Sequence, residues 1–202
     1  MKKLIYITAL YPAILILAGC TSTPASVPCQ IANTGSSIAE CDPSAPIPSR
    51  KGSLTIKTSF KTHQRDYYPL ESDDSFHGSE RIPIKVTIND AHVLWHISGK
   101  PHSLPSYNPD GSRNRNPEAG EGMMYTLEKT IIVDPGTYII TVTIGNDITV
   151  ENIDVVIEPG IPQIVELLPE YYFCTRGSRS RSHFHGIADF HAKKSVSRVP
   201  EN

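Results

Sequence analysis

Residues that could bind a metal ion gather near the end of the sequence. His183 and His185 are two positions apart, so on a β-strand both side chains would point to the same face and could reach one ion. His191, Asp189 or Cys174 could supply the remaining ligands of a tetrahedral site. The alternative is a further β segment whose apolar residues pack on the rest of the protein while the histidines face water. The sequence favours this second interpretation, and the three histidines are kept as candidate metal ligands.

Oxygen-bearing side chains occur in two long polar segments, residues 62–81 and 98–122. Such oxygens suit a hard cation, but neither segment has the regular spacing of a calcium-binding EF-hand loop. Solvated loops are therefore favoured, although long loops on a rigid scaffold are where binding usually occurs. The oxygen-bearing residues are Glu71, Asp73 and Asp74 in the first segment and Asn108, Asp110, Asn114 and Asn116 in the second.

Motifs for catalysis are missing from the sequence. It contains no Gly-x-Ser-x-Gly elbow, no His-Glu-x-x-His pair and no glycine-rich phosphate loop. The eight histidines are scattered, although a Ser-His-Asp site can be assembled from residues that are distant in sequence. We therefore predict that the protein is not an enzyme, with no catalytic residues and no cofactor. A hydrolase with a dispersed site is the alternative.

The N-terminal residues have the pattern of an export signal. A Met-Lys-Lys start precedes an apolar stretch, residues 4–17, and small residues follow it. The Leu-Ala-Gly-Cys junction that ends at Cys20 resembles the lipobox of bacterial lipoproteins. The resemblance implies cleavage before Cys20, diacylglycerol on its sulfur, usually an N-acyl chain, and anchoring to a membrane through this lipid. Because Thr21 is not aspartate, it also implies the outer membrane, facing the periplasm or the cell surface.

The other three cysteines are candidates for a disulfide. Lipidation of Cys20 leaves Cys29, Cys41 and Cys174, an odd number in a compartment that permits disulfides. Cys29 and Cys41 could close a short loop, or either could pair with Cys174. No Cys-x-x-Cys pair is present, so a structural bridge is favoured over redox chemistry.

Composition and charge divide the chain into four parts: a signal peptide (1–19), a lipidated cysteine with a flexible tether (20–52), a β-sandwich domain (53–173) and a basic tail (174–202) that we expect to be partly ordered. The net charge is −2, but the tail holds six Lys or Arg against two Asp or Glu. The tail could bind phosphate-bearing headgroups or polysaccharide, or pair with the acidic domain. Export and the negative charge argue against nucleic acid as a partner.

Alternating apolar and polar residues predict β-strands from residue 53 onward, for example at 82–88 and 138–144. The apolar phase slips between Val150 and Ile153, which predicts a β-bulge. No stretch has a sustained helical period. The expected fold is all-β: a single antiparallel β-sandwich of the Ig-like or transthyretin-like kind, with about seven strands.

The hairpin sequence at residues 133–142, Val-Asp-Pro-Gly-Thr-Tyr-Ile-Ile-Thr-Val, carries a second resemblance. Together with Glu-Pro-Gly at 158–160 and Val-Glu-Leu at 165–167, it is similar to the end of carboxypeptidase-regulatory-like, CnaB-like and PEGA-type domains. The resemblance covers about residues 53–170. It implies a β-sandwich and says little about function, because many functions share one fold.

The preferred function is therefore a lipid-anchored protein of the cell envelope, whose non-catalytic β-sandwich is structural or binds proteins or glycans. A metal-binding envelope protein that uses the C-terminal histidines and an envelope hydrolase are the alternatives. If the two long polar segments and the tail meet at one end of the sandwich, binding is favoured over scaffolding.

Overall fold

The computed structural model describes residues 30–31, 39–41, 47–69, 71–72, 74–174 and 180–196. The predicted signal peptide, Cys20 and Cys29 lie outside these residues. Within the described part of the chain, no helix is long and apolar enough to span a membrane.

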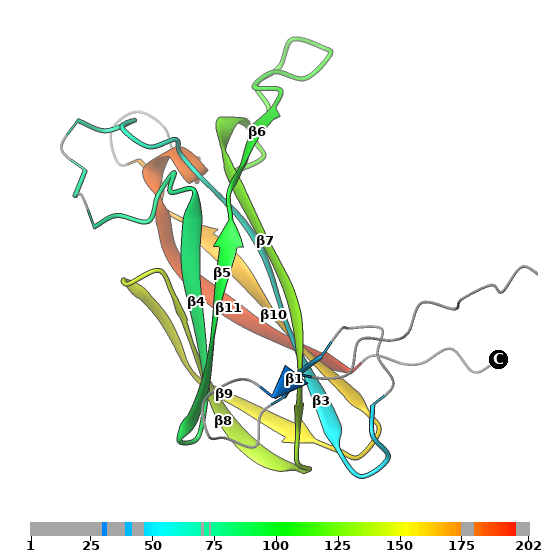
Figure 1. Cartoon of the computed structure of the whole chain (residues 1–202). Helices are drawn as coiled ribbons and strands as arrows, with labels where there is room; N and C mark the ends of the chain where they lie inside the picture. The colour runs from blue at the N-terminus through cyan, green and yellow to red at the C-terminus, as the bar shows by residue number, and fades with distance from the viewer. Residues whose placement is uncertain are drawn as a thin grey trace, which may run out of the picture.

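The described chain forms two β-sheets that face each other (Figure 1). The first sheet has the order β1-β2-β7-β3-β10-β11, and β6 also pairs with β7. The second has the order β5-β4-β8-β9. The bounds are β1 (Gln30–Ile31), β2 (Ala39–Cys41), β3 (Gly52–Thr62), β4 (Arg81–Ile88), β5 (Ala91–Ser98), β6 (Lys100–Leu104), β7 (Gly120–Val133), β8 (Gly136–Ile144), β9 (Ile148–Ile157), β10 (Pro162–Tyr171) and β11 (Ile187–Val196), with a 3₁₀ turn, η1 (His183–His185), before β11.

The alternation of apolar and polar residues explains why the central strands form and which face each of them buries. In β4 every second side chain is buried, and the same alternation occurs in β5 and at the end of β8. Their apolar residues fill the space between the sheets, where burying each large aliphatic side chain contributes about 1.5–3 kcal/mol. The prediction of an all-β fold is confirmed. The core includes Leu54, Ile56, Phe60, Ile84, Val86, Trp95, Tyr125, Leu127, Ile140, Val142, Val165 and Leu167.

The predicted bulge is also confirmed. Ile140 of β8 is paired with Ile153 of β9, whereas Val142 is paired with Val150, so β9 holds one extra residue between these two pairs. Asn152, next to the slip, has a positive φ of 58°, a conformation that asparagine tolerates.

Two parts of the sandwich prediction are wrong. The sheet is not purely antiparallel, because β3 and β10 run parallel from Ser53 opposite Pro162 to Thr58 opposite Leu167. Eleven strands form in the described chain rather than about seven. The extra strands lie at or near sheet edges and are stabilised by backbone pairing. They therefore need little apolar alternation, and eight of the ten residues in β11 are exposed.

The folded domain is longer at both ends than the predicted range of residues 53–173. β2, within the predicted tether, pairs with β7, and Glu40 accepts hydrogen bonds from Trp95 Nε1 at 3.1 Å and Lys129 Nζ at 2.5 Å. In the predicted tail, β11 pairs with β10 along nearly its whole length. These pieces are therefore part of the first sheet.

The two long polar segments and the start of the tail, around η1, meet at one end of the sandwich, the upper end in Figure 1. The first insertion, between β3 and β4, lies beside η1 and the start of β11. The second insertion begins with β6 and continues as a loop from β6 to β7. After a single residue, Gly99, β6 carries the chain from β5 of the second sheet into the first sheet. A Cβ on Gly99 would lie 2.6 Å from the ring of Tyr125, so the chain can cross between the sheets only where a side chain is absent.

Candidate metal centre

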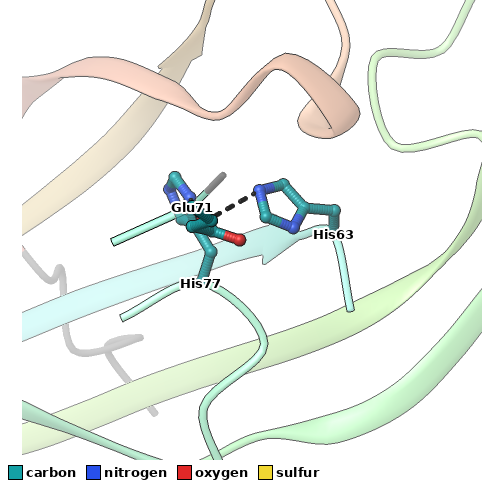
Figure 2. Close-up of side chains that lie close together, drawn as sticks. All are labelled: His63, Glu71 and His77. Carbon is teal, nitrogen blue, oxygen red and sulfur yellow. Dashed lines mark hydrogen bonds and ion pairs between the residues drawn. The ribbon is translucent and has the colours of Figure 1, made fainter. Parts of the chain in front are cut away.

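Three metal-binding side chains converge in the first insertion: His63, Glu71 and His77 (Figure 2). One ligand atom from each lies within 4.8 Å of the other two. His77 Nδ1 is 3.0 Å and His63 Nε2 is 3.5 Å from the same carboxylate oxygen, Oε1 of Glu71. The side chains are 3%, 18% and 19% exposed for His63, Glu71 and His77, so the cluster is shielded from water.

The two ends of the insertion are tied together next to these histidines. His63 directly follows Thr62, the last residue of β3, and His77 directly precedes Gly78. The amide of Gly78 donates a hydrogen bond of 2.9 Å to Thr62 Oγ1. Gly78 has φ of +66°, and a Cβ on it would lie 2.0 Å from the nitrogen of Arg65. Only glycine allows this approach, which places the two imidazole rings 4.7 Å apart.

A buried phenylalanine fixes the insertion to the second sheet. Phe76 is 7% exposed and belongs to the core. Its ring lies over Gly145, where a Cβ would come within 2.6 Å of Phe76 Cδ1. Gly145 has φ of +64° and donates a backbone hydrogen bond of 2.9 Å to Pro83. The residue next to Phe76 is His77, so core packing determines where this ligand lies.

Hydrogen bonds leave His63 suited to ligate a metal. Its Nδ1 lies 3.0 Å from the carbonyl oxygen of Gln64, which favours the tautomer with the proton on Nδ1 and leaves the Nε2 lone pair able to ligate. This lone pair faces the carboxylate oxygen of Glu71. In this tautomer both atoms are acceptors, so a metal ion or a proton between them would satisfy both. A carbonyl that orients the other ring nitrogen is typical of metal-bound histidine.

The spacing of the ligand atoms fits a transition metal. Atoms bound to tetrahedral zinc at about 2.0–2.1 Å are about 3.3 Å from one another, and the two histidine–carboxylate distances lie on either side of that value. The Glu71 carboxylate is itself oriented, because Ser75 Oγ donates a hydrogen bond of 2.6 Å to Oε1. Two imidazoles and one carboxylate form a ligand set that zinc takes in proteins.

A polar cavity of about 170 Å³ opens next to the cluster. Glu71 and His77 form part of its wall, together with Arg65, Asp66 and Tyr68. The cavity supplies an entry path for an ion and room for a water molecule as a further ligand. Burial lowers the pKa of His77, and the neighbouring His63 acts in the same direction, which favours the neutral ring that metal binding requires.

The three predicted tail ligands do not come together. His183 is fully buried, and its Nδ1 and Nε2 lie 3.1 Å and 2.8 Å from the carbonyl oxygens of Pro117 and Glu121. His191 is exposed and pairs with Glu170 at 2.5 Å. His185 belongs to η1, not to a strand, so the expected alternation of strand side chains does not apply to it and His183.

His183 instead helps to hold the second insertion on the sandwich. Lys61 is also fully buried, and its ammonium donates hydrogen bonds to the carbonyl oxygens of Glu118 at 2.8 Å and Gly120 at 2.5 Å. Lys61 and His183 together contact four carbonyl groups between residues 117 and 121. Their role here is structural, because buried backbone carbonyls need partners.

The oxygen-bearing residues of the second insertion form turns. Asp110 accepts from the amide and hydroxyl of Ser112, at 2.9 Å and 2.6 Å. Asn114 accepts from the amide of Asn116, whose own side-chain oxygen accepts from the amide of Glu118, both at 2.9 Å. The two hydrogen bonds from Ser112 lower the pKa of Asp110. The oxygens of Asp110, Asn114 and Asn116 therefore stabilise the loop backbone.

In the first insertion, the sequence indicated Glu71 as a possible ligand but did not indicate His63 or His77. Asp73 lies outside the described residues, and Asp74 is exposed. The available signal was two histidines at the two ends of one polar insertion with a glutamate between them. Their spacing is irregular, so only closure of the loop makes them neighbours.

The predicted disulfide stays a prediction. Cys174 follows β10 in a half-buried position. Cys29 and the side chain of Cys41 lie outside what the structure describes.

No family model, curated protein or solved structure matches this chain in comparisons with known proteins. The two family resemblances therefore rest on their sequence motifs alone.

We predict that stability depends on the pH through His183. Burial lowers the pKa of His183 below its ordinary value of 6.5, and the nearby Lys61 acts in the same direction. As the pH falls, the unfolded chain takes up this proton before the folded protein does. The free energy of unfolding should therefore decrease as the pH falls through 6.5 and below it. Urea unfolding of His183→Gln should show a weaker decrease than wild type, and an equal decrease would contradict this account.

Proposed function

We propose that this chain is a lipid-anchored protein of the bacterial cell envelope whose β-sandwich binds a divalent transition-metal ion. The observation that carries the metal-binding proposal is the convergence of His63, Glu71 and His77, with separations of 3.0 Å and 3.5 Å to one carboxylate oxygen. This proposal replaces the C-terminal histidines with residues of the first insertion.

Zinc is the ion that we assign to this centre. Imidazole nitrogen suits zinc, copper, nickel and iron, whereas calcium and magnesium take oxygen ligands. Zinc accepts a tetrahedral set of two histidines, one glutamate and water, which matches the donors and the adjoining cavity. We propose binding rather than catalysis, because the sequence holds none of the catalytic motifs considered above.

The envelope location is supported by the export signal and the Leu-Ala-Gly-Cys junction at Cys20. Two or three acyl chains there would hold the protein on the outer membrane nearly permanently, since each buried methylene contributes about 0.8 kcal/mol. We further propose that the sandwich is of the Ig-like or transthyretin-like kind. Its support is the Pro135-Gly136 turn sequence, which resembles the closing part of carboxypeptidase-regulatory-like domains. The expected hairpin is wrong, however, because this turn connects β7 of the first sheet to β8 of the second, and the two strands do not pair.

Calorimetric titration with Zn²⁺ tests the metal centre. We expect one ion per wild-type chain. His63→Ala and His77→Ala should each weaken binding by more than about tenfold, because even the loss of an outer partner of a metal ligand costs about 10–100-fold. Mg²⁺ should not compete.

His191→Ala is the matched control, because this exposed tail histidine also pairs with a glutamate. It should bind Zn²⁺ as wild type does. Weakening in His191→Ala with no change in His63→Ala would contradict the proposed centre and favour a tail site.

Mass spectrometry of membrane fractions tests the anchor separately. The wild-type N-terminus should be Cys20 carrying diacylglycerol, whereas Cys20→Ala should leave an unlipidated precursor. A wild-type chain without lipid would contradict membrane anchoring and would leave the metal centre untouched.

A further inference from the structure

A second cavity, of about 320 Å³, lies where the two insertions meet the segment before β11. Its volume is within the range of small-ligand sites, about 300–1,000 Å³. The first insertion contributes Tyr67 and Tyr68, the second contributes residues 113–116, and the chain before β11 contributes Arg181 and Phe184. Three segments that are distant in sequence therefore build one concave surface.

The charge of this cavity is positive. Arg113, Arg115 and Arg181 line it, and no aspartate or glutamate is among its described lining residues. Arg181 pairs with Glu170, outside the cavity. Arg113 and Arg115 are exposed and have no ion pair among the described residues. Guanidinium groups bind carboxylate or phosphate through two parallel hydrogen bonds.

One wall of the cavity is aromatic and held in place. Tyr67 is 51% exposed, and its ring lies 5.2 Å from that of Phe184 at an angle of 31°. The ring of Tyr68 stands edge-on to that of Tyr67 at 4.9 Å, and its hydroxyl donates a hydrogen bond of 2.8 Å to the carbonyl of Phe184. Fixed, partly exposed tyrosines offer a flat amphipathic contact surface at little entropic cost.

Another part of the cavity lining is polar and is also held in place by hydrogen bonds. Asn114 Nδ2 donates a hydrogen bond of 2.8 Å to the carbonyl of Pro105, and the asparagine turns described above fix residues 114–118. The side-chain amide of Asn116 still has its donor hydrogens available for a ligand, because only its oxygen is engaged among the described contacts. His185, which also lines the cavity, has a buried Nδ1 without a partner in the described chain.

We propose that this cavity binds an acidic carbohydrate, a sugar that carries a carboxylate or a phosphate. The flat tyrosine faces suit the C–H face of a pyranose ring, the amide and hydroxyl groups suit its hydroxyls, and the arginines suit its acidic group. A neutral sugar leaves the arginines without partners, and a lipid tail finds too little apolar wall. The proposal goes beyond the metal centre and does not depend on it, because the lining residues include none of the three metal ligands.

Calorimetric titration of the full mature chain with trigalacturonate, mannose 6-phosphate, maltotriose and inorganic phosphate tests the proposal. We expect saturable binding of at least one acidic sugar, at least about tenfold tighter than that of maltotriose, with binding weakened by salt. Comparing the affinities of trigalacturonate and mannose 6-phosphate shows whether the cavity prefers a sugar carboxylate or a sugar phosphate. If inorganic phosphate binds as tightly as either acidic sugar, the carbohydrate assignment is overturned. It is also overturned if neither trigalacturonate nor mannose 6-phosphate shows saturable binding.

Two variants locate the binding. Arg113→Gln combined with Arg115→Gln should weaken acidic-sugar binding more than tenfold and reduce its salt dependence. Tyr67→Ala should weaken it without changing the salt dependence. Arg81→Gln is the matched control, because Arg81 is an exposed arginine at the start of β4, outside the cavity. These side chains are exposed, so the variants should keep the wild-type melting temperature. Wild-type affinity in the double arginine variant would overturn the proposal.

Discussion

Closure of the first insertion is the constraint on which both candidate sites depend. The hydrogen bond from Gly78 to Thr62 and the close approach of Gly78 to Arg65 bring the two ends of the insertion together. Any larger residue at this position would force the ends apart, because its Cβ would overlap the backbone. The cost of ordering a long polar loop is offset by Phe76, which is buried in the core of the sandwich.

The closed insertion serves two surfaces at once. His63 faces Glu71 and His77 on one side, and its ring also contacts Tyr68 at 5.2 Å and Tyr67 at 5.7 Å. The same tyrosines form the aromatic wall of the larger cavity. The candidate metal centre and the cavity therefore share these side chains as a common support. Long loops at one end of a β-sandwich are a common place for binding, because the sheets hold them still.

The central strands could be predicted from the sequence, and their partners could not. Alternation in β4 and β8 identifies the buried face, and the slip between Val150 and Ile153 identifies the bulge, because side-chain direction is a local property. The parallel pairing of β3 with β10 depends on how distant segments pack. The further β segment favoured for the tail is confirmed as β11, but its position rested on a few apolar residues, because only Ile187 and Phe190 of this strand are buried.

The candidate metal centre could not be predicted from the sequence for the same reason, because it depends on contacts between residues that are distant in sequence. His63 and His77 stand at the two ends of an irregular loop, and nothing in their spacing predicts contact. The tail histidines had regular spacing, but η1 removes the strand geometry on which that argument rests. Buried His183 shows that a histidine can pack against backbone carbonyls instead of a metal ion, because its ring nitrogens lie 3.1 Å and 2.8 Å from two carbonyl oxygens.

X-ray absorption at the zinc edge of zinc-loaded protein tests the central claim most directly, because it identifies the atoms around the ion. The account predicts only nitrogen and oxygen ligands at about 2.0–2.1 Å, with the outer scattering of two imidazole rings. Sulfur at about 2.3 Å, or the absence of imidazole scattering, would contradict it.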